Sequence, residues 1–153
     1  MQLTIRYGTR DDREFIEHLG KRTVMDSVPP LRHPEPGDVL RNFERLLAIV
    51  ERRESLALIA ESDGVRVGFV LLLASLPDEV TGDDQAYIAY MAVERDRRGG
   101  GIGAALLAAA EDEARRLGAP YMALMVTEEN APARALYERA GYLTERRLLC
   151  KML

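Results

Sequence analysis

The feature that most constrains this chain is a glycine-rich turn between a strand-like segment and a helix-like one. Four of the five residues 99–103 are glycine, and two arginines, Arg97 and Arg98, precede them. The apolar segment Tyr87–Val93 is predicted to be a strand, and the alanine- and leucine-rich segment up to Leu117 a helix. Glycines let several backbone N–H groups converge on an anion at a helix N-terminus, and arginine donates paired hydrogen bonds to phosphate. The sequence therefore predicts a phosphate-binding turn.

Length and charge limit the kind of protein and partner. The 153 residues fit a single domain, residues 1–153. The formal net charge is −4, which gives no indication of a nucleic acid or a membrane surface as partner, so the attraction for phosphate must be local. The N-terminus has no basic-then-apolar signal pattern, and no apolar run approaches about 18 residues. We therefore expect a cytoplasmic protein.

Cysteines and histidines are too few for a disulfide framework or a metal site. The single cysteine, Cys150, fits a reducing compartment and is expected to be a small buried side chain. His18 falls in a predicted helix and His33 in a proline-rich loop, without spaced Cys, Asp or Glu ligands. We therefore expect no metal cofactor.

Hydrophobic periodicity and turn residues predict the order of the elements. The order is β-α-α-β-β-β-α-β-α-β, an α/β (α+β) fold with a mixed central sheet flanked by helices. Besides the helix after the glycines, helices are expected to follow the capping residues Thr9, Asp38 and Asn130. Asp63 and Gly64 predict a tight hairpin. Strands are expected at residues 3–7, 56–60, 65–74, 87–93 and 121–126 and from Tyr142 onward.

Two common phosphate-binding turns fit these glycines poorly. A P-loop needs Gly-Lys-Ser/Thr at the helix start, and Gly103 is followed by two alanines, so a P-loop is excluded. A dinucleotide-binding fold needs an acidic residue at the end of the next strand. That strand is followed by Thr127, and Glu128 lies too far along. A dinucleotide-binding domain is kept as a remote alternative.

Two segments resemble the signatures of the GCN5-related N-acetyltransferase (GNAT) family. Arg98-Gly-Gly-Gly101-Ile-Gly103-Ala resembles the family's Arg/Gln-x-x-Gly-x-Gly/Ala signature, and residues 130–142 resemble its Asn-x-x-Ala-x-x-Leu-Tyr-x-x-x-Gly-Phe/Tyr signature. The two are in register, separated by one helix and one strand, and the predicted element order matches the GNAT fold. The resemblance thus covers nearly the whole chain. It implies an acetyl-CoA-dependent N-acetyltransferase.

The resemblance also implies roles for individual residues. The turn and Arg98 would hold the pyrophosphate of acetyl-CoA, and backbone groups of Met91 and Val93 would pair with the pantetheine arm as if it were another strand. Asn130 would contact that arm from the other side. Tyr137 would act as general acid, because the reference pKa of a phenol, about 10, is close to that of a thiol, about 8.5. The expected cofactor-binding residues are Met91, Ala92, Val93, Arg98, Gly99, Gly100, Gly101, Ile102, Gly103, Ala104, Asn130 and Tyr137.

The acceptor and the general base stay open. In members that acetylate peptide N-termini a Glu lies five residues before the conserved Asn, and here that position is Met125. An amine on a small molecule, a protein lysine or an N-terminus is expected to attack the thioester directly in a ternary complex. A non-catalytic acyl-CoA-binding module of the same fold is the main alternative. Carboxylates that can serve as the base are Glu79, Asp83, Asp84, Glu128 and Glu129.

Two further expectations concern surfaces. Tyr87 and Tyr90 lie at odd spacing on one predicted strand, so they are expected to face opposite sides of the sheet, and one of them can line the acceptor pocket. The family resemblance also allows a homodimer through the sheet edge or the last strand.

Overall fold

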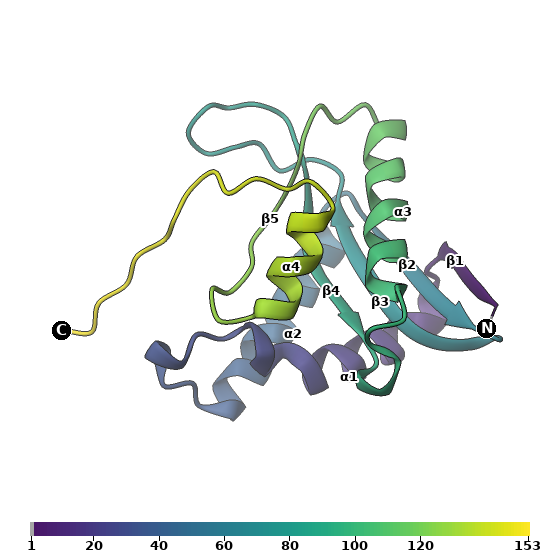
Figure 1. Cartoon of the computed structure of the whole chain (residues 1–153), viewed down its shortest axis with the longest axis horizontal. Helices are drawn as coiled ribbons and strands as arrows, with labels where there is room; N and C mark the ends of the chain where they lie inside the picture. Colours follow the sequence, from purple (N-terminus) through teal and green to yellow (C-terminus); the bar gives the residue numbers. More distant parts are fainter. Residues whose placement is uncertain (1) are drawn as a thin grey trace.

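The computed structural model describes residues 2–153 as a five-stranded sheet with helices on both faces (Figure 1). The strands lie in the order β1-β2-β3-β4-β5, antiparallel except for the parallel pair β4–β5, which confirms the mixed sheet. The elements are β1 (Leu3–Tyr7), α1 (Arg13–Thr23), α2 (Pro36–Arg52), β2 (Ser55–Ser62), β3 (Val65–Leu73), β4 (Ala86–Val93), α3 (Ile102–Arg116), β5 (Met122–Leu124) and α4 (Ala131–Arg139).

The apolar core lies in two layers, one on each face of the sheet. Ile102, Leu106 and Leu107 of α3 pack on one face, where Leu136 and Tyr137 of α4 join them. The helices α1 and α2 cover the opposite face (Figure 1), where Ile16, Leu19 and Val50 belong to the second layer of the core. Because β3 lies at the centre, both of its faces are covered and it is buried from its third residue to its last. No helix within residues 2–153 has both the length and the apolarity to cross a bilayer.

The start of the second helix differs from its prediction. The helix α2 begins at Pro36, two residues before the expected cap Asp38, and it is capped by Glu35. The Glu35 carboxylate accepts a hydrogen bond from the Gly37 backbone N–H at 3.3 Å. Proline at the first helical position costs nothing, since that N–H has no partner inside a helix. The last proline of the proline-rich segment is therefore the first residue of α2.

The hairpin prediction is confirmed, and the prediction of a last strand is wrong. Asp63 and Gly64 have φ values of 51° and 79°, as a tight hairpin turn requires. Residues 143–153, by contrast, lie in neither a helix nor a strand, and Cys150 is exposed rather than buried. Figure 1 shows this segment, in yellow, running away from the sheet. A strand needs a backbone partner, and within residues 2–153 this segment pairs with none.

A buried carboxylate ties β1 to the start of α1. The Asp12 side chain is 1% exposed, and the two terminal nitrogens of Arg6 donate to its two oxygens at 2.8 and 2.9 Å. The Thr9 backbone N–H donates to it at 2.8 Å, so Asp12 forms a capping box with the expected cap Thr9. The Arg6 hydrogen bond is the main cause that lowers the pKa of Asp12 from 3.8 to about 2.

We expect Asp12→Asn to lower the free energy of unfolding by about 2 kcal/mol at pH 7, measured by urea denaturation. The folded pKa of Asp12 lies below the unfolded one, so its stabilisation is present above about pH 4 and is lost as the pH falls toward 2. The gap between wild type and variant should therefore close with acidification. Asp112→Asn, whose side chain is 79% exposed, is the control and should change little. A gap that stays constant down to pH 2 would contradict this account.

Candidate functional site at the split between two strands

The candidate site begins where β4 and β5 separate. On one edge β4 pairs with β3 from Tyr87 to Val93, whereas on its other edge it pairs with β5 only through Ala86–Ile88. Within residues 2–153, the stretch Ala89–Val93 therefore has no strand partner on the edge that faces β5. The chain after β5 diverges from β4 in Figure 1. The result is an open split, in which backbone N–H and C=O groups of β4 can bind an extended ligand.

A β-bulge bends β4 where the split opens. Leu71 pairs with Tyr90 and Leu72 with Ile88, so Ala89 is an additional residue in β4. A bulge bends the strand and shifts the alternation of its side chains. Tyr87 and Tyr90 consequently pack on the same face, against the core of α1 and α2. The prediction that they face opposite sides is wrong, because odd spacing separates faces only in a regular strand.

The glycine-rich turn follows the end of β4 and leads into α3. Gly99 and Gly101 have φ values of 82° and 85°, and an added Cβ at either one would meet no atom within 4 Å. These glycines are thus required by the backbone conformation and not by packing. Gly101 is the N-cap of α3, and no side chain of residues 2–153 caps this helix. Its first N–H groups, from Ile102 onward, are therefore available to an anion.

Arg98 lies between the end of β4 and the turn that follows α1. Its Nε donates to the Val93 carbonyl oxygen at 3.2 Å, and its Nη2 lies 3.5 Å from Oδ2 of Asp26. Arg95 contacts the other oxygen of the same carboxylate at 3.6 Å. The Arg98 side chain is 46% exposed, so it can reach a ligand at the turn. Sequence reasoning found Arg98 but missed Asp26.

The 3₁₀ turn Val24–Ser27 connects the two sides of the split. The Thr23 hydroxyl lies 2.8 Å from the Tyr90 hydroxyl on β4, and the Thr127 hydroxyl, beyond β5, donates to the Ser27 carbonyl oxygen at 2.5 Å. These contacts join residues 67 and 100 positions apart. The sequence carries no pattern that brings such residues together.

Tyr137 projects from α4 as a partly buried phenol. It packs against the core beside α3, and its ring centroid lies 5.9 Å from that of Tyr142. Burial is the main cause that raises the pKa of Tyr137, and the neighbouring Tyr90 raises it further. Its hydroxyl has no hydrogen-bond partner within residues 2–153, whereas the Tyr142 hydroxyl donates to Glu111 at 2.8 Å. At neutral pH Tyr137 is therefore a protonated donor.

Asn130 has the capping role that the sequence predicts. Its Oδ1 accepts a hydrogen bond from the Ala133 backbone N–H at 3.3 Å, and its own N–H donates to the Thr127 carbonyl oxygen at 3.0 Å. These bonds fix the start of α4 next to the end of the split.

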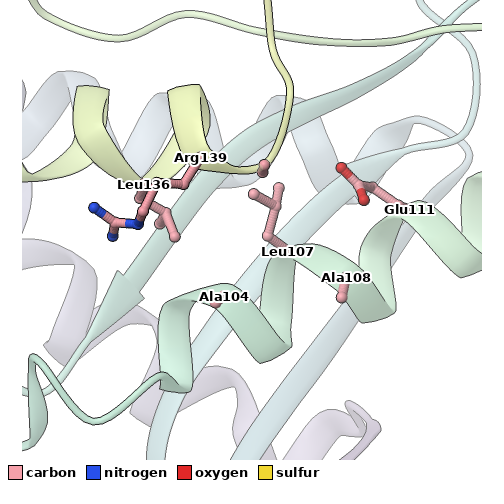
Figure 2. Close-up of a pocket in the computed structure, with 7 residues that line it drawn as sticks. Ala104, Leu107, Ala108, Glu111, Leu136 and Arg139 are labelled. Atoms are coloured by element: carbon pink, nitrogen blue, oxygen red, sulfur yellow. The ribbon is translucent and has the colours of Figure 1, made fainter.

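A cavity of about 270 Å³ lies between α3 and α4 (Figure 2). Of the predicted site residues only Ala104 lines it. The cavity therefore adjoins the glycine-rich turn, but the glycines of the turn do not line it. A Cβ on Gly103 would lie 3.3 Å from Leu136, so glycine there permits the close approach of α4. Figure 2 shows Arg139 and Glu111 at opposite ends of the cavity. The lining residues are Ala104, Leu107, Ala108, Glu111, Leu136, Arg139 and Ala140.

The carboxylates considered as general base occupy exposed positions. Those of the loop 77–84 precede β4, whereas the glycine-rich turn follows it, so the loop and the turn lie at opposite ends of this strand. Asp84 accepts a hydrogen bond from Ser75 at 2.7 Å. The Glu128 side chain is 85% exposed, and that of Met125 is 82% exposed. The geometry favours no single one of these carboxylates.

Comparison with known proteins gives the same family as the two signatures. The sequence model of the acetyltransferase (GNAT) family matches residues 22–142. A mycothiol acetyltransferase of Clavibacter michiganensis subsp. michiganensis is 37% identical over 142 residues, which cover 92% of this chain and 42% of that protein. The chain thus spans less than half of this relative.

Solved structures share the whole fold. A Pyrococcus furiosus protein assigned as an acetyl transferase has a TM-score of 0.83 and 28% sequence identity, covering 99% of this chain and 100% of that one. An aminoglycoside N-acetyltransferase in complex with CoA has a TM-score of 0.72 and 20% identity, covering 99% of this chain and 95% of that one.

Proposed function

Because the chain belongs to the acetyltransferase (GNAT) family, we propose that it transfers an acetyl group from acetyl-CoA to an amine acceptor. The observation that carries the proposal is the open edge of β4 at Ala89–Val93, which leads directly into a turn suited to phosphate. The extended arm that carries the thioester can pair with the backbone of a strand edge, and the pyrophosphate at the other end of that arm requires an anion site. The two are adjacent here.

Acetyl-CoA would lie in the split with its pyrophosphate at the start of α3. The backbone of Gly99–Ala104 and the guanidinium of Arg98 would hold the phosphates, which is supported by the uncapped helix start. Backbone groups of Met91 and Val93 would pair with the pantetheine arm. Asn130, whose Oδ1 caps α4, would meet the arm from the opposite side.

The chemistry requires positioning and proton transfer, without a protein nucleophile. The neutral amine attacks the thioester carbonyl carbon, and a backbone N–H can stabilise the oxyanion that forms. The carbon–sulfur bond then breaks, the amine proton passes to a base or water, and the thiolate takes a proton from Tyr137. Burial raises the pKa of Tyr137, so the phenol carries its proton at neutral pH, but the same shift makes it a weaker acid. The role therefore depends on the position of the hydroxyl beside the sulfur and not on the shift.

The acceptor would enter from the side built by α1 and the turn Val24–Ser27. A matched relative is named mycothiol acetyltransferase and a structure that shares the fold is an aminoglycoside N-acetyltransferase. Both names indicate a small molecule as acceptor, and a protein amine is the alternative.

We expect the protein to release CoA from acetyl-CoA faster with a suitable amine than without one. The deacetyl form of mycothiol is itself a thiol, so with this amine CoA is separated and measured by chromatography. With an aminoglycoside, a polyamine and a lysine peptide, CoA is followed by a thiol reagent. Because Cys150 is exposed and also reacts with that reagent, the assay uses Cys150→Ser.

Calorimetry on the same protein separates the alternatives. Acetyl-CoA binding without turnover of any amine would favour a non-catalytic acyl-CoA-binding module. NAD binding without CoA binding would favour a dinucleotide-binding domain.

Arg98→Gln is expected to weaken acetyl-CoA binding by about 10- to 100-fold, because a charge-assisted hydrogen bond to phosphate contributes about 1.5–3 kcal/mol. Titration calorimetry gives the two dissociation constants. Arg115→Gln is the matched control, since this arginine lies at the other end of α3 and is 70% exposed. Equal affinity for Arg98→Gln and the wild type would remove Arg98 from the cofactor site.

Tyr137→Phe is expected to lower kcat by about 100-fold or more, as for the loss of a general acid, while acetyl-CoA affinity stays unchanged. Steady-state kinetics and calorimetry measure the two quantities separately. Tyr121→Phe, at a position 59% exposed, should keep full activity. An unchanged kcat in Tyr137→Phe would assign the proton transfer to another group.

A further inference from the structure

Asp26 is a carboxylate whose two arginine partners hold it loosely. Its Oδ1 lies 3.6 Å from Nη2 of Arg95, and its Oδ2 lies 3.5 Å from Nη2 of Arg98. Both distances exceed the roughly 2.7–2.9 Å of a charge-assisted hydrogen bond. The neighbouring ion pair is tighter, because Arg22 donates to both oxygens of Glu94 at 2.7 and 2.8 Å. The Asp26 side chain is also 41% exposed, so a stronger partner can replace either arginine.

Arg98 keeps a second contact that does not depend on this carboxylate. Its Nε donates to the Val93 carbonyl oxygen at 3.2 Å, whereas its Nη2 is the nitrogen near Asp26. The outer end of the guanidinium can therefore exchange one anion for another while Nε stays at the end of β4. A pyrophosphate at the glycine-rich turn has more negative charge and more acceptor oxygens than a carboxylate, so it is the stronger competitor for that outer end.

Asp26 lies in a turn that contacts both sides of the split. It is the one carboxylate of the 3₁₀ turn Val24–Ser27. Thr23, just before this turn, contacts the Tyr90 hydroxyl at 2.8 Å, and the last residue of the turn accepts a hydrogen bond from Thr127 at 2.5 Å. Burial is the main cause that raises the pKa of Tyr90, and the negative charge of Asp26 raises it further. The carboxylate is therefore close to the part of β4 where the split is open.

A carboxylate displaced from Arg98 at this place is suited to a cation on the acceptor. The amine that attacks the thioester must have lost its proton, so it is not the group that a carboxylate holds during the reaction. A second ammonium on the same acceptor keeps its charge at neutral pH, since the reference pKa of an alkyl amine is about 10.4. Asp26 thus favours an acceptor with several amines over an acceptor with one.

We propose that Asp26 competes with the phosphates of the cofactor for Arg98, and that the displaced carboxylate binds a second ammonium on the acceptor. This inference rests on the proposed acetyl transfer and names the acceptor class as polyamines and aminoglycosides. The cofactor and the acceptor then strengthen each other's binding, because each takes one member of the Asp26–Arg98 pair and leaves the other member available.

Titration calorimetry on a double-mutant cycle tests the competition. Asp26→Asn should bind acetyl-CoA about 2- to 5-fold more tightly than the wild type, because a half-exposed ion pair has only modest strength. In the Arg98→Gln background the same substitution should change the affinity less, since the contested guanidinium is gone. Asp96→Asn is the control, because this 82% exposed carboxylate contacts Arg97 instead, and its effect should be equal in both backgrounds.

The outcomes of this cycle separate the inference from the proposed function. Weaker acetyl-CoA binding in Asp26→Asn would show that the carboxylate positions Arg98 rather than competing for it, which overturns the proposal. An equal gain in both backgrounds is a general charge effect and overturns it as well. A wild type that binds no acetyl-CoA contradicts the proposed function on which the inference rests.

Calorimetry with two polycations tests the acceptor role without any need for turnover. Spermidine and kanamycin should bind the wild type about 5- to 10-fold more tightly when the protein is saturated with CoA, which carries the same phosphates as acetyl-CoA. Asp26→Asn should lose this gain, whereas Asp96→Asn should keep it. Butylamine, with a single amine, should show no gain. An equal gain in the wild type and Asp26→Asn, or no binding of either polycation to the CoA complex, overturns the acceptor role.

Discussion

The short pairing between β4 and β5 is the constraint on which the site depends. On one edge β4 pairs with β3 from Tyr87 to Val93, with the bulge at Ala89, so its position is fixed by the centre of the sheet. On its other edge only Ala86–Ile88 are paired, and the bulge at Ala89 bends the strand just where β5 leaves it. If β5 paired with β4 over a longer stretch, the split would close. The N–H and C=O groups of β4 would then be bonded to β5 and could not bind a ligand.

Charge acts locally in this protein. The chain is net negative, yet the guanidinium of Arg98 and the uncapped start of α3 place positive charge at the end of the split. Asp26 contacts both Arg98 and Arg95, so it holds the Arg98 guanidinium near the turn. A phosphate bears more charge and more acceptor oxygens than this carboxylate, so a phosphate at the turn would compete with Asp26 for Arg98.

The sequence predicts the elements that local chemistry specifies. The glycine-rich turn, the hairpin at Asp63 and the cap at Asn130 each depend on residues within a few positions, and each is found. The bulge at Ala89 could not be predicted, because it is a misalignment between two strands. Contacts such as Thr127 with Ser27 join distant segments and carry no periodic signal. The family signatures indicate the cofactor, whereas the acceptor side is built from the less patterned first half.

The prediction of a last strand failed for the same reason: strand formation depends on contacts between distant segments, which the sequence does not show. Residues 143–153 have the apolar content of a strand, and this property is local. Whether a strand forms depends on an available edge, which is a property of the assembled sheet. Here β5 has an unpaired outer edge within residues 2–153, while the Arg146–Asp78 ion pair fixes residues 143–153 elsewhere. A segment with the apolar content of a strand thus stays extended without joining the sheet, because long-range contacts decide where it lies.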